Sequence, residues 1–231
     1  MPEPLAIVLA GGPRSPAASH LPDGLSAAGA WVVAADSGLD RARAMGLRVD
    51  LVVGDMDSVG RGALGAAAAG GTKVQEHPEA KDATDLELAL DAARDHGARR
   101  IVVLGSDSGR LDHVLAIAAL VAAPRYAATA VEAWLGPAHL VVVREAPAAL
   151  AGRPGDLVSL LPVHGVAQGV TTEGLLYPLS DEDLGPGSTR GVSNELVAAR
   201  ATVTVRGGVL VAVLPGQAGS HLRRGVGPTR H

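Results

Sequence analysis

The sequence contains no cysteine and no phenylalanine, and these absences exclude several kinds of protein. Among its 231 residues there is no Cys, so disulfides, zinc–thiolate centres and thiol nucleophiles are excluded, and we expect a reducing, cytoplasmic location. Aromatic residues make up only 2% of the chain: Trp31, Trp134, Tyr126 and Tyr177. We therefore expect aliphatic cores and few side chains able to stack on a planar ligand.

Strong charge and long apolar runs are also missing. The chain has 20 basic and 24 acidic residues, a formal net charge of −4, which provides no field for attracting nucleic acid. No apolar run reaches the roughly 18 residues that a membrane helix needs, and the first residues lack the basic segment of a signal peptide. With 47% hydrophobic residues, the chain can bury two substantial cores. We expect a small-molecule partner, with no nucleic acid and no membrane.

Apolar runs alternate with helical segments through about residue 125. The β-type runs cover residues 5–10, 31–35, 51–53, 73–75 and 101–104. Such alternation predicts a parallel sheet with helices on both faces. We therefore assign residues 1–128 to an α/β domain.

Short polar residues mark where the helices of this half are expected to begin. Ser37 with Asp40, and Thr84 with Glu87, have the spacing of capping boxes. Asp112 is expected to cap an apolar helix over residues 114–123. Residues 60–71 are almost all Ala and Gly, which suits either a helix or a flexible loop.

The pattern changes from residue 130 onward. Short β-type runs separated by Gly and Pro cover residues 131–135, 140–144, 157–161, 168–172, 201–206 and 209–214. This spacing predicts an all-β sandwich over residues 129–217, followed by a mobile tail at 218–231. Gly207-Gly208 is expected to form a hairpin turn between the last two strands.

An acidic motif follows the strand at residues 51–53. Asp55 and Asp57 come directly after Gly54, at the end of a strand where open α/β sheets bind their ligands. Crowded carboxylates repel unless a cation neutralises them, and hard oxygen ligands favour Mg²⁺ carrying phosphates. The segment Lys81–Asp85 adds Asp82 and Asp85 at the start of a helix. Alone it fits helix capping and a solvated lysine, but beside the first motif it indicates further ligands.

Other polar groups occupy similar positions in both halves. Asp36 follows a strand, where it is either a site residue or an acid favoured by the helix dipole. Arg110 suits phosphate oxygens, whereas His113 is either an acid or base or a local hydrogen-bonding group. Tyr177 and the Ser193-Asn194 pair suit the binding of a flat nitrogen heterocycle. The same residues also fit the edge of a sandwich.

These motifs together resemble the thiamine pyrophosphokinase family. The matching segments are Ala35–Gly38, Gly54–Ser58, Lys81–Asp85, Gly109–His113, Gly174–Leu179 and Ser193–Glu195, in the family's order over residues 31–215. The resemblance implies transfer of a diphosphoryl group from ATP to thiamine, giving thiamine diphosphate and AMP. It also implies that the α/β domain at residues 1–128 is catalytic and binds ATP and metal, and that the β-sandwich at 129–217 binds thiamine. Two such chains would form a homodimer whose thiamine sites lie between subunits.

The resemblance also assigns roles by position. It implies magnesium ligands and catalytic acids at Asp55, Asp57, Asp82 and Asp85, with Lys81 and Arg110 binding phosphates. The nucleotide would be supported by Ser58, Arg110 and His113, and the nucleotide or the metal by Asp36 and Asp112. Thiamine would be bound by Tyr177, Ser193 and Asn194. The sequence departs from the family pattern at Ser37, at Leu39-Asp40 and at Ser108.

Two alternatives remain open at this point. Asp55-Met56-Asp57 also fits the D-x-D pattern of a metal-dependent nucleotide-sugar glycosyltransferase. A regulator that binds a nucleotide or thiamine without turnover is the second alternative. The second acidic segment argues against the first, and the four intact acids argue against the second.

Overall fold

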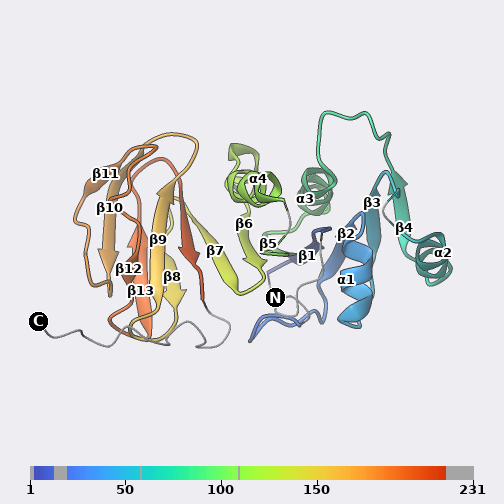
Figure 1. Cartoon of the computed structure of the whole chain (residues 1–231), viewed down its shortest axis with the longest axis horizontal. Helices are drawn as coiled ribbons and strands as arrows, with labels where there is room; N and C mark the ends of the chain where they lie inside the picture. The colour runs from blue at the N-terminus through green and yellow to red at the C-terminus, as the bar shows by residue number, and fades with distance from the viewer. Residues whose placement is uncertain (1–2, 13–19, 58, 109, 217–231) are drawn as a thin grey trace, which may run out of the picture.

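The protein has two halves lying side by side, one with helices and one almost entirely of strands (Figure 1). The structure is a computed structural model that describes residues 3–12, 20–57, 59–108 and 110–216. The first half contains β1 Leu5–Leu9, β2 Trp31–Ala35, α1 Gly38–Ala44, β3 Leu51–Gly54, α2 Arg61–Ala69, β4 Lys73–Glu76, α3 Asp85–Asp95, β5 Arg100–Gly105, α4 Leu111–Val121, the short 3-10 helix η2 Pro124–Tyr126 and β6 Ala130–Leu135.

The expected parallel sheet is present, in the order β4-β3-β2-β1-β5-β6. Strands β1, β2, β3 and β5 are nearly continuous apolar runs because both of their faces are covered, whereas β4 at the edge of the sheet is exposed. Helix α3 and the end of α4 pack on one face, where the cluster includes Val8, Leu90 and Val121. Helices α1 and α2 pack on the other, with Ile7 and Leu39 in a separate cluster. The chain fills the sheet from β1 to β4 and then returns to place β5 on the other side of β1.

This sheet continues into the second half without a break. β6 pairs parallel with β5 and antiparallel with β7 Ala138–Val143, and the order then runs β7-β14-β9-β12. Ten strands therefore form one mixed sheet across both halves. The domain boundary expected at residues 128/129 lies just before β6, inside this continuous sheet, and the division into folding units stays a prediction.

The second half is rich in strands, as expected. Its remaining strands are β8 Ala148–Ala151, β9 Leu157–Pro162, β10 Ala167–Glu173, β11 Glu182–Leu184, β12 Asn194–Glu195, β13 Arg200–Thr204 and β14 Leu210–Leu214. Four of them form a second sheet in the order β11-β10-β13-β8. A hydrophobic cluster joins this sheet, through Leu150 and Val203, to Leu160 and Leu210 of the ten-stranded sheet.

The hairpin expected at Gly207-Gly208 is wrong. β13 pairs with β8 and β10, whereas β14 pairs with β7 and β9 in the other sheet. The two glycines instead carry the chain from one sheet to the other. Gly208 has φ +79, and a Cβ there would lie 2.2 Å from the Val166 carbonyl oxygen, so the close approach requires glycine.

The helix starts agree with the sequence in one case of three. The Thr84 hydroxyl accepts a hydrogen bond from the Glu87 N–H at 3.2 Å, as a capping box predicts. Ser37 makes no side-chain cap to α1. Asp112 is not the cap of α4 either: Arg110 occupies the N-cap position, and Asp112 lies inside the first turn.

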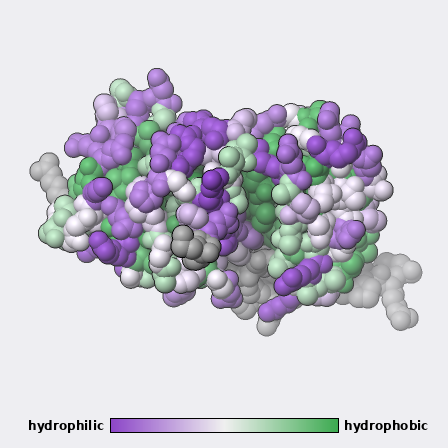
Figure 2. Space-filling view, turned by 180° about the vertical axis from the view of Figure 1, so that it is seen from behind, coloured by the Kyte–Doolittle hydropathy of each residue, from purple (hydrophilic) through white to green (hydrophobic). Residues whose placement is uncertain are grey.

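Two further observations complete the arrangement. Seen from behind, hydrophilic side chains gather along the upper edge of the α/β half, and hydrophobic surface is visible in the recess between the halves (Figure 2). Within the described residues, no helix is both long and apolar enough to span a membrane. The expectations for Ser58 and for the tail at 218–231 fall outside the described residues.

Candidate active site

A cavity lies beyond the carboxyl ends of β1 and β5. These two strands are neighbours, but the chain leaves β1 in one direction along the sheet and returns to β5 in the other. Such a switch point opens a crevice in doubly wound sheets. The cavity measures about 360 Å³, and its floor includes Gly11 and Gly12 after β1 and Ser106 after β5. The fold therefore provides a ligand site at this position before any side chain is considered.

Three carboxylates converge beside this cavity. Asp36 follows β2, and Asp55 and Asp57 follow β3, the next strand in the sheet. One oxygen from each lies within 4.8 Å of the others. The Asp57 N–H donates to Asp55 Oδ1 at 3.2 Å, which fixes the turn that carries both acids. Oxygen ligands from adjacent strand ends suit a hard divalent cation.

The backbone around these acids adopts conformations that are unusual for side-chain-bearing residues. Asp36 has φ 46 and Met56 has φ 63, values that cost free energy and often occur at functional sites. Gly54 has φ +155, and a Cβ there would lie 3.1 Å from the Asp36 Cβ and 3.3 Å from the Asp85 Cγ. The glycine thus allows Asp36 and Asp85 to approach the end of β3 from two sides.

Lys81 balances part of this negative charge. Its Nζ lies 2.7 Å from Asp85 Oδ1 and 3.6 Å from Asp55 Oδ2, and its side chain is only 14% exposed. The bond to Asp85 is the main reason that the pKa of Lys81 is raised. The Asp57 N–H, with Lys81 contributing, lowers the pKa of Asp55. Lys81 and Asp55 are therefore both charged over the neutral pH range.

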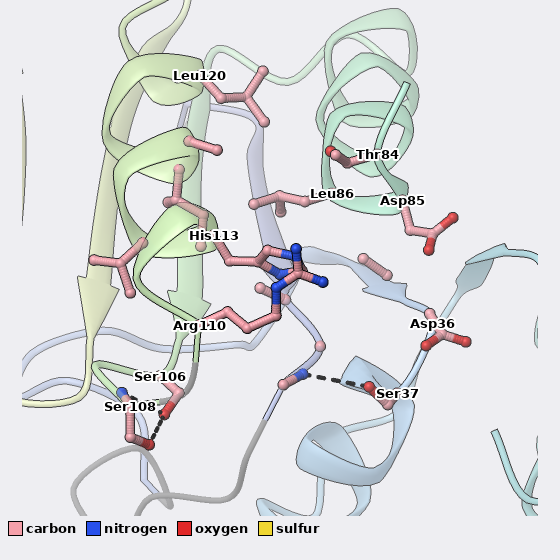
Figure 3. A pocket seen from close by; sticks show the side chains of 17 residues that line it. Asp36, Ser37, Thr84, Asp85, Leu86, Ser106, Ser108, Arg110, His113 and Leu120 are labelled. Atoms are coloured by element: carbon pink, nitrogen blue, oxygen red, sulfur yellow. Dashed lines mark hydrogen bonds between the residues drawn. The ribbon is translucent and has the colours of Figure 1, made fainter. Parts of the chain in front are cut away.

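The opposite wall of the cavity is formed by the start of α4. Arg110 and His113 point into the cavity across from Asp36 and Asp85 (Figure 3). Arg110 pairs with Asp112 through Nε–Oδ1 at 3.1 Å and Nη2–Oδ2 at 2.6 Å. This pair raises the pKa of Arg110 and lowers that of Asp112. The apolar part of the wall comes from Leu86, Val114, Ile117 and Leu120.

Sequence reasoning missed two serines on the cavity floor. Ser106 is buried, and its Oγ lies 2.7 Å from Ser108 Oγ and accepts from the Ser108 N–H at 3.2 Å. Only one hydroxyl proton is used between the two oxygens, so the pair has a second hydroxyl proton to donate. Ser37 also lines the cavity, and its Oγ accepts from the Gly12 N–H at 3.4 Å. The strand-end position was the available signal for Ser106.

The structure brings together some of the residues predicted for the metal site and not others. Asp55 and Asp57 lie together, and Asp85 reaches them through Lys81. The third member of the carboxylate group is Asp36, which had been expected to support either the nucleotide or the metal. Asp82 is exposed in the loop before α3 and is not part of the group.

The residues expected to bind thiamine lie in the strand-rich half, away from the cavity lining. The Tyr177 side chain is 57% exposed. Asn194 is buried, and its side chain accepts from the Tyr177 N–H at 3.0 Å and donates to the Tyr177 carbonyl at 2.7 Å. It also accepts from the Glu195 N–H at 2.9 Å. Asn194 therefore holds the Tyr177 backbone in place, while Ser193 is exposed beside it.

This geometry defines a class of protein: an open α/β fold that binds a small ligand beside clustered carboxylates at the carboxyl edge of its parallel strands. Comparisons with known proteins identify the family. Residues 24–133 match the model for "Thiamin pyrophosphokinase, catalytic domain", and residues 140–210 match "Thiamin pyrophosphokinase, vitamin B1 binding domain". The chain belongs to the thiamin pyrophosphokinase family and is accordingly an enzyme, a thiamine diphosphokinase.

Solved structures agree with this assignment. Thiamine pyrophosphokinase from Bacillus subtilis is 25% identical with a TM-score of 0.75, and the match covers 93% of this chain and 99% of that one. The enzyme from Geobacillus thermodenitrificans is 28% identical with a TM-score of 0.72, covering 90% and 96%. The enzyme from Candida albicans shares the fold at 12% identity and a TM-score of 0.68, covering 90% and 88%. No curated protein matches the sequence.

Proposed function

We propose that this enzyme transfers the diphosphoryl group of ATP to the hydroxyl of thiamine, using the cavity at the β1–β5 switch point for the nucleotide. The observation that carries the proposal is the set of three carboxylates beside that cavity, facing Arg110. Phosphoryl transfer depends on positioning and on cations that neutralise charge. Attack at the β-phosphorus releases AMP, so positive charge is needed along the triphosphate.

The carboxylates fit a magnesium ion. Asp36, Asp55 and Asp57 each present one oxygen, and these oxygens lie within 4.8 Å of one another. This arrangement matches the preference of Mg²⁺ for a few carboxylates together with substrate phosphates. When bound, the ion would neutralise charge on the phosphate oxygens. Asp85 pairs with Lys81, so in this proposal it orients Lys81 rather than binding the ion directly.

The cationic side chains have separate tasks in this proposal. Lys81 lies on the metal side of the cavity and is held by two carboxylates, so it binds phosphate oxygens without moving far. Arg110 uses its Nε and Nη2 edge for Asp112, which leaves the Nη1 edge to face a phosphate. His113 lines the same space. The Ser106–Ser108 pair donates its remaining hydroxyl proton to the nucleotide.

Incubation of the pure protein with ATP, Mg²⁺ and thiamine tests the function directly. We expect thiamine diphosphate and AMP in equal amounts, and ADP as a product would overturn the proposed transfer. Asp57→Asn is expected to reduce turnover by about a hundredfold or more, because one electrostatic stabiliser is lost. A near-normal rate in that variant would remove Asp57 from the metal site.

We further propose that two copies form a homodimer with thiamine bound between them. Asn194 lies on the edge strand β12, and its side chain bonds to the Tyr177 backbone. Four exposed apolar residues belong to β12 or to the segments next to it in sequence or in space: Leu157, Leu176, Tyr177 and Val197. Backbone bonds and strand pairing join their segments, as in Leu176 N–H to Glu195 O and the Glu195–Leu157 pair. Contiguous exposed apolar surface of this kind commonly marks an interface.

A charge placed in this apolar group tests the dimer. Val197→Lys is expected to convert the dimer to monomers in analytical ultracentrifugation and to raise the Michaelis constant for thiamine. Val74→Lys is the matched control, because Val74 is also an exposed valine but lies on β4, at the other edge of the ten-stranded sheet. A monomeric wild-type protein, or equal effects of both changes, would contradict the dimer proposal.

The proposal also covers the architecture of the strand-rich half and the cellular location of the reaction. We interpret the strand-rich half as a β-sandwich, which is supported by the hydrophobic cluster shared between its two sheets. We place the reaction in the cytoplasm, where ATP is available and where the absence of cysteine suits reducing conditions.

A further inference from the structure

Helix α4 ends without the usual means of satisfying its last carbonyl groups. The helix runs to Val121, and its C-cap residue is Ala122, with no glycine in the left-handed conformation after it. The last four carbonyls of a helix have no partner within the helix and need one from elsewhere. For α4, the Leu120 oxygen accepts from the Ala123 N–H at 2.9 Å. The Ala119 oxygen, and the oxygens of Ala122 and Ala123 just beyond the helix, are bound from the other half of the protein.

Two cationic or ionisable side chains of the strand-rich half bind these carbonyls. Arg144, one residue beyond β7, donates from Nη2 to the Ala122 oxygen at 2.7 Å and to the Ala123 oxygen at 3.0 Å. His164, two residues beyond β9, places Nε2 2.8 Å from the Ala119 oxygen. Because a carbonyl only accepts, His164 Nε2 carries the proton in this contact. Positive charge at this helix end is also favoured by the helix dipole.

The same helix forms a wall of the cavity. Val114, Ile117 and Leu120 line the cavity on one side of α4. On its outer side, Leu111 and Leu115 are exposed, so packing on that side does not hold the helix. The position of the wall therefore depends strongly on what holds the two ends of α4, and Arg144 and His164 hold the C-terminal end.

We propose that Arg144 and His164 are positioning residues for nucleotide binding: they fix α4 at its C-terminal end and thereby set the width of the cavity. The inference rests on the proposed use of this cavity by ATP. Neither side chain lines the cavity, so both act through the helix. Loss of either contact lets α4 shift. The shift widens the cavity and weakens the contact between its apolar wall and the nucleoside.

The test compares nucleotide and thiamine parameters in Arg144→Met and His164→Leu. We expect each change to raise the Michaelis constant for ATP about tenfold, equivalent to about 1.4 kcal/mol, and to leave that for thiamine within about twofold. Arg144→Lys and His164→Gln keep a donor near the same carbonyls and are expected to restore most of the affinity. Arg206→Met is the matched control, because Arg206 pairs with Asp181 at an exposed site remote from α4.

Calorimetric titration with AMP and Mg²⁺ separates this inference from the proposed function. If the wild-type protein makes no thiamine diphosphate but binds AMP, and the variants bind it about tenfold more weakly, the reaction is wrong and the positioning role stands. Equal rises for ATP and thiamine, or unchanged AMP binding in the variants, would overturn the positioning role. If Arg144→Met does not fold, His164→Leu decides the question, because His164 is exposed.

Discussion

Replacing Gly54 with alanine tests the acidic site by moving two of its carboxylates with one added methyl group. The new Cβ would lie 3.1 Å from the Asp36 Cβ and 3.3 Å from the Asp85 Cγ. Ordinary contacts between such atoms begin near 3.4 Å, so both neighbours must shift by a few tenths of an ångström. Protein ligands of a metal keep their distances to within about 0.2 Å. A shift of this size is therefore enough to disturb the proposed magnesium site.

The expected result has two components. Alanine at φ +155 costs about 1–3 kcal/mol of stability, because side-chain-bearing residues rarely adopt this conformation. Turnover should fall at least tenfold, because displacements below 1 Å already cost catalysis heavily. We would measure AMP release at saturating ATP, thiamine and Mg²⁺, and unfolding by urea. The Mg²⁺ concentration for half-maximal rate should also rise.

Gly65→Ala is the matched control. Gly65 is exposed within α2, and nothing lies within 4 Å of an added Cβ. The same substitution there should leave the rate unchanged and stabilise the helix by up to about 1 kcal/mol. A Gly54→Ala enzyme with the wild-type rate and the wild-type need for Mg²⁺ would refute the reasoning, because Asp36 and Asp85 would then not be held in functional positions.

Three further predictions concern other parts of the molecule. Lys81→Met should lower turnover by about a hundredfold and weaken ATP binding in steady-state kinetics, and an unchanged rate would exclude Lys81 from phosphate binding. Tyr177→Ala should raise the Michaelis constant for thiamine more than that for ATP, whereas a change confined to ATP would place the heterocycle elsewhere. Tyr126→Phe removes the bond from the buried phenol to Asp91 at 3.1 Å and should cost about 1 kcal/mol in urea unfolding at pH 8. Burial raises the pKa of Tyr126 in the folded protein. The Tyr126 hydroxyl therefore stabilises the fold fully below about pH 10, the pKa of an unfolded tyrosine, and less at higher pH. A stability difference between the wild type and the Phe variant that grows at pH 10.5 would contradict this.

The alternation of strands and helices was enough to predict the parallel sheet and its functional edge. Asp55 and Asp57 follow a strand, so their placement required only the rule for open sheets. The partnership with Asp36 required more, because it depends on β2 being the neighbour of β3. Pairing order is a property of tertiary packing, and nothing local in the sequence specifies it.

The error at Gly207-Gly208 came from treating neighbours along the chain as neighbours in space. Gly207-Gly208 separates two apolar runs, which is the usual pattern of a hairpin. β14 is buried along nearly its whole length, whereas β13 alternates between buried and partly exposed residues. A strand with both faces buried belongs inside a sheet, and β14 accordingly lies between β7 and β9.

The role of Asp82 stays a prediction, and the structure shows only that Asp82 lies outside the group of three carboxylates. It lies three residues before Asp85, but α3 begins only at Asp85, so Asp82 stays in the exposed loop. In the strand-rich half, Tyr177 and Asn194 were both expected to lie near thiamine. Their contact is through the Tyr177 backbone, a detail that residue types do not contain.

The place of β14 affects how the protein can fold during its synthesis. Strands β1 to β6 pair with one another and are complete once residue 135 has left the ribosome. β7 and β9 do not pair with each other and must wait for β14, at residues 210–214, to arrive between them. The α/β half can therefore form early, while the other half keeps two open strand edges until residues 210–214 have been synthesised, a period in which it is exposed to aggregation.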